Sequence, residues 1–230
     1  MKAGLFENLR DAIAAQQACA VVTDIDGGQQ CLVGFGDDAG DLSLNEAHVQ
    51  KVVQMITEDV SGQIEDTSLF VRVYGPALRL IIVGAVHIAQ ALAPMAQLAG
   101  FNVTVIDQRD AFVRAGRLSD VAALTDWPDD GMLKLKPDAR TAIVTLTHDP
   151  KLDDPALAAA LRSDAFYIGS LGSKRTHAKR LERLREEGFS ELDLDRIHGP
   201  VGLDIGAKTP SEIAVSILSE VVATRRRAAA

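Results

Sequence analysis

The loop G-S-L-G-S-K-R, residues 169–175, combines the residue types that bind a phosphate group at the start of a helix. Ser173 is a natural helix cap, and Lys174 and Arg175 follow it with two positive charges. The first turn of a helix has backbone N–H groups without partners, and charged donors bind phosphate strongly. The sequence therefore predicts a phosphate-binding turn at this point. The residues before the cap that belong to the same candidate site are Gly169, Ser170 and Gly172.

The alternative for this segment is an ordinary helix start followed by a basic helix in solvent. The cations beyond the first turn are expected to be only a solvated face. The expected inward residues are Ala178, Leu181 and Leu184, and those expected to point largely outward are Arg180, Arg183 and Arg185.

A second glycine-rich loop, residues 199–208, leads into a clear helix start. Thr209 can cap this helix, and Glu212 can reach back to close a capping box. Glycines let the backbone approach a ligand closely, so Asp204 and Gly206 are candidate binding residues. The alternative is a tight turn that only feeds a core helix.

A buried strand followed by the turn G-A-V-H, residues 84–87, resembles the first part of a mononucleotide-binding unit. Gly84, His87 and Asp107, which ends the next strand, are candidate cofactor residues. The second glycine of the usual fingerprint is Val86 here, and its β-branched side chain is expected to obstruct a diphosphate. We therefore expect a Rossmann fold with weak or absent NAD(P) binding, and an NAD(P)-dependent oxidoreductase is the alternative function.

A third strand ends in T-L-T-H-D, which places His148 and Asp149 at the carboxyl edge of the predicted sheet. Ligands bind at this edge in open α/β sheets, so both residues are candidates for lining the pocket. A histidine there can act as a base or as a hydrogen-bonding contact, but it can also be an ordinary loop residue. Cys19 and Cys31 fit no metal-ligand or redox motif and are expected to be buried. We predict no catalytic residue and no metal site.

Composition limits the classes of partner. The chain has 230 residues, 47% hydrophobic content and a net charge of −8, which argues against nucleic acid or an anionic membrane as the main partner. Residues 80–106 carry no charge and are long enough to cross a bilayer, but polar residues, glycines and Pro94 favour a strand, a helix and a strand. The first residues lack the apolar core of a signal peptide, so a cytoplasmic protein is expected.

The chain divides into two regions with different patterns of predicted helices and strands. Residues 1–76 read as a small α+β domain, with a helix to Gln17, a hairpin near residues 26–28, a helix after Ser43 and a strand over residues 69–74. Residues 77–230 read as a mostly parallel sheet with helices on both faces, because buried strands alternate with helices. The predicted strands of this second region are residues 79–83, 102–107, 141–146, 165–168 and 196–198.

These motifs together resemble the XdhC family, the accessory proteins of molybdenum hydroxylases such as xanthine dehydrogenase and carbon monoxide dehydrogenase. The resemblance covers residues 77–225, in the family's order and spacing. It is carried by G-A-V-H at 84, D-Q-R at 107, L-T-H-D at 146, Y-I-G-S-L-G-S-K-R at 167 and G-P-V-G-L-D-I-G-A-K-T-P-S-E-I-A at 199.

The resemblance implies a Rossmann-like carboxyl-terminal domain that binds the molybdenum cofactor, as molybdopterin or its cytosine dinucleotide, and delivers it to an apo molybdenum hydroxylase. It also implies a homodimer, with cofactor-synthesis or sulfuration enzymes as further partners. The alternative within the same family is a scaffold for enzyme assembly that binds no cofactor. The chain departs from the family pattern at Val86, and it lacks the S-G-G-C-V-E motif of the usual first domain, so it resembles a short member.

Overall fold

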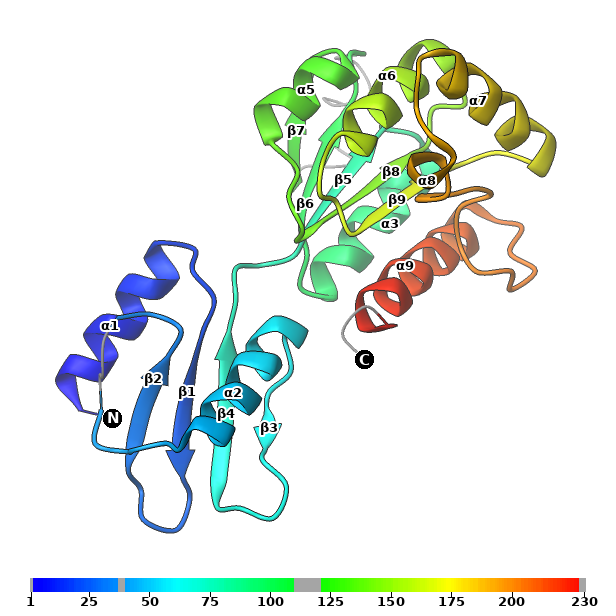
Figure 1. Ribbon diagram of the computed structural model, residues 1–230. Coiled ribbons are helices and arrows are strands. Elements are labelled where there is room, and N and C mark those ends of the chain that lie inside the picture. The colour runs from blue at the N-terminus through cyan, green and yellow to red at the C-terminus, as the bar shows by residue number, and fades with distance from the viewer. Residues whose placement is uncertain (1, 37–39, 110–120, 228–230) are drawn as a thin grey trace. The chain divides into compact units, whose positions relative to one another are not determined.

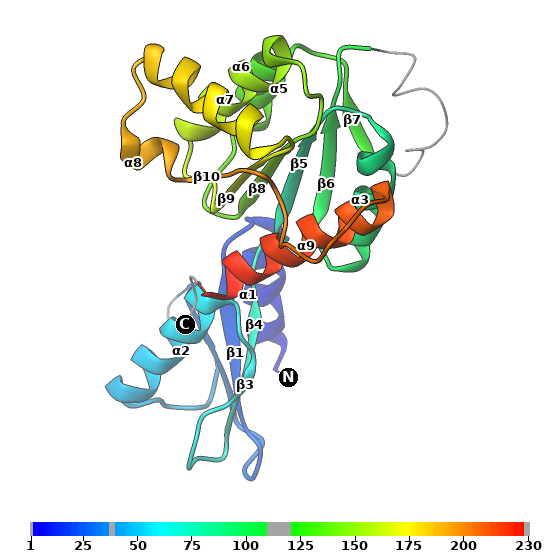
Figure 2. The same ribbon diagram turned by 90° about the vertical axis from the view of Figure 1, so that its right-hand side faces the viewer.

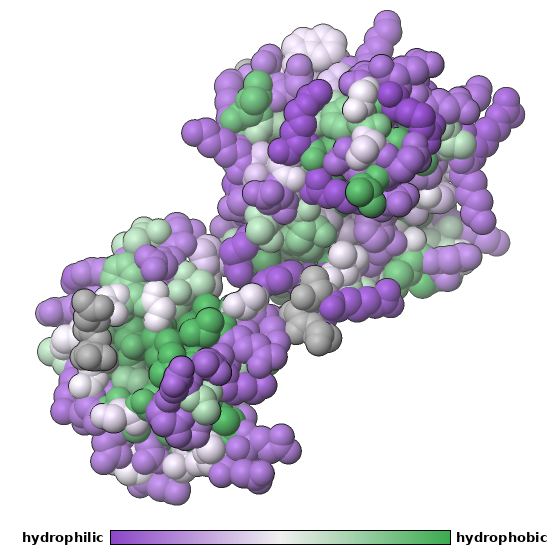
Figure 3. All heavy atoms as spheres, viewed as in Figure 1, coloured by the Kyte–Doolittle hydropathy of each residue, from purple (hydrophilic) through white to green (hydrophobic). Residues whose placement is uncertain are grey.

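The chain folds into two compact units, each with its own sheet, in the computed structural model (Figure 1), which describes residues 2–36, 40–109 and 121–227. The first unit is built from residues up to Pro76 together with Arg226 and Arg227, and the second consists of residues Ala77–Arg225. Polar side chains cover most of the face of the second unit seen in Figure 3, with apolar side chains in small patches.

The first unit has a four-stranded antiparallel sheet of order β2-β1-β4-β3 with a helix on each face. Alternation along β1 sends Cys19 and Val21 toward α1, and Ala20 and Val22 toward α2. Both cysteine thiols are buried, as expected. The elements are α1 (Ala3–Ala14), β1 (Cys19–Asp24), β2 (Gln30–Val33), α2 (Glu46–Glu58), β3 (Gly62–Gln63) and β4 (Leu69–Tyr74).

The second unit has a six-stranded parallel sheet of order β10-β9-β8-β5-β6-β7. Its strands are β5 (Arg79–Val83), β6 (Asn102–Ile106), β7 (Ala122–Leu124), β8 (Thr141–Thr145), β9 (Tyr167–Ser170) and β10 (Ile197–His198). The sequence pattern did not predict β7. The predicted strand that corresponds to β9 began two residues early, at Ala165 instead of Tyr167. The central strands are buried on both faces, so alternation gives no signal for their ends.

Helices cover both faces of this sheet, as predicted. Figures 1 and 2 show α3 and α9 on one face and α5, α6 and α7 on the other. On the face covered by α3 and α9, the side chains of Leu80 and Ile82 of β5 belong to one hydrophobic core with Leu92 of α3 and Ile217 of α9. The helices are α3 (His87–Leu98), α5 (Pro128–Leu135), α6 (Pro150–Leu161), α7 (Lys174–Glu186), α8 (Glu191–Leu194) and α9 (Pro210–Arg227).

The uncharged segment of residues 80–106 forms β5, α3 and most of β6. Within the described ranges, no helix combines the length and apolar character needed to cross a membrane.

The chain reverses its direction of winding at β5. It runs from β5 outward through β6 to β7, then returns to lay down β8 on the other side of β5 and continues to β9 and β10. This reversal is a topological switch point, and doubly wound sheets bind ligands beyond the carboxyl ends of the strands that flank it, here β5 and β8.

The start of α9 has the capping box that the sequence predicted. The Thr209 hydroxyl accepts from the backbone N–H of Glu212 at 3.3 Å, and the Glu212 carboxylate accepts from the backbone N–H of Thr209 at 2.9 Å. These bonds satisfy donors that would otherwise be unpaired at the helix end.

We expect Thr209→Ala to lower the free energy of unfolding by about 1 kcal/mol, because it removes one of the two capping bonds. Ser211→Ala, at an exposed position in the same turn, is the control and is expected to change stability by less than about 0.5 kcal/mol. Urea unfolding measures both. Equal effects of the two substitutions would contradict the role assigned to the cap.

Candidate functional site

The carboxyl ends of β5, β8 and β9 lie in register, so the loops that follow them emerge side by side. Val83 pairs with Thr145, and Thr145 pairs with Ser170. The hydroxyl groups of Thr145 and Ser170, both buried, lie 2.5 Å apart. This row of strand ends brings together three predicted segments: the Gly84 turn, the His148 loop and the loop before α7.

The Gly84 turn is pressed against the loop after β8. Gly84 has a left-handed φ of +108°, and a Cβ at this position would lie 2.8 Å from the Thr147 methyl group. The glycine is therefore needed for contact between two loops of the chain itself. Val86 is the N-cap residue of α3 and is half-buried against the core, whereas His87, the first residue of the helix, is exposed.

Asp107 is buried, and its carboxylate is fully engaged within the chain. It accepts from the backbone N–H of Ala85 at 2.7 Å, and from the backbone, Nε and Nη2 of Arg109 at 3.0, 2.9 and 2.7 Å. Burial raises the pKa of Asp107, but the bonds from Arg109 and Ala85 outweigh it and hold the pKa below its ordinary value. The carboxylate that would bind a ribose hydroxyl in a dinucleotide site is thus occupied by Arg109.

The loop after β8 places His148 and Asp149 at the surface. His148 is exposed and has a left-handed φ of +62°. Asp149 caps α6 through a bond from the backbone N–H of Lys151 at 3.0 Å. Beneath them, the Thr147 hydroxyl donates to Asp153 Oδ1 at 2.7 Å. The Thr147–Asp153 bond therefore anchors the loop, and its two predicted residues are exposed at the carboxyl edge of the sheet.

The loop before α7 has the helix start that the sequence predicted. Ser173 Oγ accepts from the backbone N–H of Thr176 at 3.1 Å, and Lys174 and Arg175 are exposed. Gly172 has a left-handed φ of +149°. Gly169 belongs to β9, where a Cβ would lie 2.5 Å from a Val201 methyl group. The cap and the two cations thus face solvent at the end of β9.

The orientation predicted for α7 was wrong at two positions. Ala178 is exposed, and Arg180, expected to point outward, is buried with 2% of its surface accessible. The sequence signal that would have indicated this is the acidic pair Asp153-Asp154 beside the apolar second half of α6, the helix that packs against α7. Asp153 lies 3.7 Å from Arg180, and Asp154 pairs with Arg183.

The loop of residues 199–208 is tied to α9. The backbone N–H of Leu203 donates to the carbonyl of Ser216, whose hydroxyl donates back to the carbonyl of Leu203. A Cβ on Gly202 would clash with Ser216 Oγ, so this glycine serves packing. The predicted residues Asp204 and Gly206 are exposed, and Gly206 has open space around it.

Glu220 of α9, which the sequence did not single out, joins this loop to the sheet. Its Oε2 accepts from the Tyr167 hydroxyl at 2.6 Å and from the backbone N–H of Gly202 at 2.7 Å, while its Oε1 lies 3.2 Å from His198 Nδ1. Burial and the Glu220 carboxylate raise the pKa of Tyr167, so its hydroxyl stays a donor. Glu220 therefore fixes the start of the loop beside β9.

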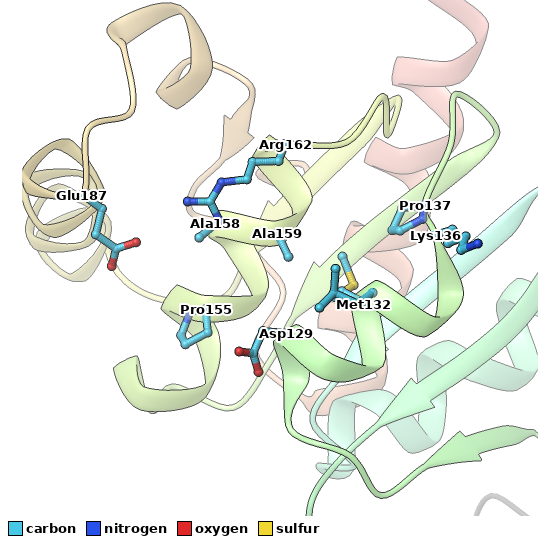
Figure 4. Close-up of a pocket in the computed structure, with 10 residues that line it drawn as sticks. Asp129, Met132, Lys136, Pro137, Pro155, Ala158, Ala159, Arg162 and Glu187 are labelled. Carbon is cyan, nitrogen blue, oxygen red and sulfur yellow. The ribbon is translucent and has the colours of Figure 1, made fainter.

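A separate pocket of about 520 Å³ lies between α5 and α6 (Figure 4). Met132, Pro137, Pro155, Ala158 and Ala159 contribute to its lining, with charged groups of Asp129, Lys136, Arg162 and Glu187 around them. None of these residues belongs to the loops at the carboxyl edge, so this pocket is not part of the candidate site.

Among the residues that the structure describes, no group of three or more His, Cys, Asp or Glu side chains is placed to hold a metal ion.

The strand order and the glycine turn after β5, at the switch point of the sheet, define a Rossmann-type domain. A family model described as the XdhC Rossmann domain matches residues 80–221. The chain belongs to the XdhC family, as its motifs predicted.

Curated relatives extend this likeness. The chain is 33% identical over 152 residues to the molybdenum cofactor insertion chaperone PaoD of Escherichia coli K12, covering 66% of this chain and 42% of PaoD. It is 28% identical over 226 residues to a Bacillus subtilis protein described as a probable subunit of xanthine dehydrogenase, covering 97% of this chain and 66% of that protein. It is also 33% identical over 165 residues to the uncharacterized protein YqeB of E. coli K12, covering 70% of this chain but only 30% of YqeB. The chain therefore spans less than half the length of the two E. coli proteins.

A solved structure has a similar fold. A Bacillus halodurans protein, described as a xanthine dehydrogenase, superposes with a TM-score of 0.75 at 25% sequence identity, covering 98% of this chain and 68% of that one.

The Asp107–Arg109 pair makes stability depend on pH. We expect Asp107→Asn to lower the free energy of unfolding at pH 7 by about 1 to 3 kcal/mol, nearer the lower value because the Arg109 side chain is 40% exposed. The folded-state pKa of Asp107 is depressed, so its contribution is present above about pH 4 and is lost as the pH falls through the folded pKa. Urea unfolding at about pH 7 and pH 3 measures the difference. A loss of the same size at both pH values would contradict this account.

Proposed function

We propose that the protein binds the molybdenum cofactor, as molybdopterin or its cytosine dinucleotide, and delivers it to a molybdenum hydroxylase of the xanthine dehydrogenase or carbon monoxide dehydrogenase type. The observation that carries the proposal is the start of α7, where Ser173, Lys174 and Arg175 meet the row of strand ends. Support also comes from the relative PaoD, which is described as a molybdenum cofactor insertion chaperone.

The residues at this edge fit a phosphate-bearing cargo. The first backbone N–H groups of α7 point out of the helix end, the helix dipole adds partial positive charge, and the exposed Lys174 and Arg175 stand beside them. Gly84, His87, His148 and Asp149 would line the part of this edge that faces the rest of the cargo. Asp204 and Gly206 would close the site.

The protein works in this proposal as a carrier and not as a catalyst, with an apo molybdenum hydroxylase as its main partner. A cytoplasmic homodimer, with contacts to cofactor-synthesis or sulfuration enzymes, belongs to the same proposal. The B. subtilis relative, described as part of a xanthine dehydrogenase, supports a molybdenum hydroxylase as the client.

We expect Lys174→Ala and Arg175→Ala each to weaken cofactor binding by roughly tenfold to a hundredfold, because each removes a charge-assisted bond to phosphate. Binding can be measured with molybdenum cofactor released from a purified molybdoenzyme, as pterin retained by the protein on gel filtration. The same variants should load an apo hydroxylase less well.

Lys179→Ala is the matched control, because this exposed lysine lies on the same helix and its loss changes the net charge equally. Arg185 is less suitable as a control, since it is paired with Glu191 at 2.6 Å. An equal loss of binding in all three variants, or no loss in any of them, would show that the start of α7 is not the site.

We also expect no saturable binding of NAD in the micromolar range. Val86 replaces the glycine of the fingerprint, and Arg109 occupies the carboxylate of Asp107 that would receive the ribose. Isothermal titration calorimetry of the full chain with NAD is the measurement. A micromolar or tighter dissociation constant would favour the oxidoreductase alternative.

A further inference from the structure

Arg180 is a buried cation that lies directly beneath the loop before α7. Its Nη2 donates to the carbonyl of Leu171 at 3.0 Å, and a Cβ on Gly172 would lie 3.8 Å from the same nitrogen. The residue is only 2% exposed, and its Nε and Nη1 have no hydrogen-bond partner. A buried guanidinium with two unused donors is costly unless a negative charge stands nearby.

Asp153 compensates this charge only in part. Its Oδ2 lies 3.7 Å from Arg180 Nη2, beyond hydrogen-bond distance, and has no hydrogen-bond partner. Its Oδ1 instead accepts from the Thr147 hydroxyl at 2.7 Å. The pair thus has its positive end under the Leu171–Gly172 turn and its negative end under the Thr147 loop.

His177 stands beside the pair without adding charge. Its ring lies so close to Gly199 that a Cβ there would clash with Nδ1. Burial, and then the charge of Arg180, lower the pKa of His177, so the ring is neutral at physiological pH. The charge under the loop before α7 is therefore that of Arg180, partly balanced by Asp153.

We propose that Arg180 supplies a buried positive charge behind the anion site at the start of α7, and that Asp153 orients a phosphate-bearing ligand by disfavouring its phosphate near the Thr147 loop. The inference rests on the proposed function in taking the start of α7 as the phosphate site. It adds Arg180 as a residue that attracts the phosphate electrostatically without touching it. A charge in the protein interior is screened less than one at the surface, so this attraction is stronger than that of an exposed cation at the same distance.

The separation of charge between Arg180 and Asp153 also predicts the orientation of a bound ligand. The phosphate would lie against the Leu171–Gly172 turn, above Arg180. The uncharged, hydrogen-bonding part would lie toward the Thr147 loop and the Gly84 turn, which touches Thr147. Asp107 is neutralised by Arg109, whereas Asp153 keeps an oxygen without a donor, and the exposed carboxylate of Asp149 adds negative charge on the same side.

The second ion pair between α6 and α7 provides a matched control. Arg183 Nη2 donates to Asp154 Oδ1 at 3.0 Å, three residues beyond Arg180 on the same helix, and its side chain is 36% exposed. Removing both charges of either pair leaves no unpaired buried charge, so both double variants are expected to fold.

The test compares Asp153→Asn/Arg180→Gln with Asp154→Asn/Arg183→Gln in the full chain. The probe is inorganic pyrophosphate, measured by calorimetry, with circular dichroism to verify the fold. We expect the first double variant to bind pyrophosphate roughly tenfold or more weakly than the wild type, and the second to stay within about twofold. Wild-type affinity in the first double variant, equal losses in the two, or no pyrophosphate binding by the wild type would each overturn the proposal.

If the first double variant does not fold, Arg180→Lys answers the same question, because it leaves neither charge of the pair unpaired. Lysine keeps the charge and should retain most of the wild-type affinity for pyrophosphate, and a loss of roughly tenfold or more in a folded Arg180→Lys variant would overturn the proposal. Pterin without phosphate, which should bind equally to the wild type and the first double variant, tests whether the pair acts on the phosphate. Failure to bind or deliver the molybdenum cofactor would refute the proposed function, whereas dependence of pyrophosphate binding on Arg180 stands or falls independently.

Discussion

The parallel pairing of β5, β8 and β9 is the constraint from which the candidate site follows. Parallel neighbours cannot be joined by a tight turn, so each connection must cross a face of the sheet as a helix. All loops that follow a strand consequently emerge at one edge, and the register of Val83, Thr145 and Ser170 sets them level. Residues far apart in the sequence meet there without any direct contact between their side chains being required.

The sequence predicted the layers of the second unit and the helix starts better than the strand ends. Caps are local, so Ser173 and Thr209 could be recognised from their own residues and those three positions further on. The end of β9 depends on pairing with β8 and on the backbone bond from Val201 to Ser170, which no local pattern reveals. The short strand β7 likewise exists only through its pairing with β6.

The sequence predicted which loops follow neighbouring strand ends, but not which side chains are buried beneath those loops. Charged residues were assigned to the surface by residue type, and this rule failed at Arg180, because its partner Asp153 lies on another helix. The sequence also could not indicate why several glycines are needed. Gly84 and Gly202 make room for Thr147 and Ser216 of this chain, so their presence reflects loop packing as much as any approach by a ligand.

The two outer strands of the parallel sheet are its shortest, with three residues in β7 and two in β10. An exposed strand edge offers unpaired N–H and carbonyl groups to any other extended chain, and a long edge invites aggregation. Here the strands of four or five residues are all interior. The short outer strands thus disfavour pairing of this sheet with strands of other chains. The longer hydrophobic strands, which would pair readily if they were exposed at an edge, are all protected by neighbouring strands. The surface of this unit is therefore formed mainly by helices and loops, which include the end of the sheet where the loops gather.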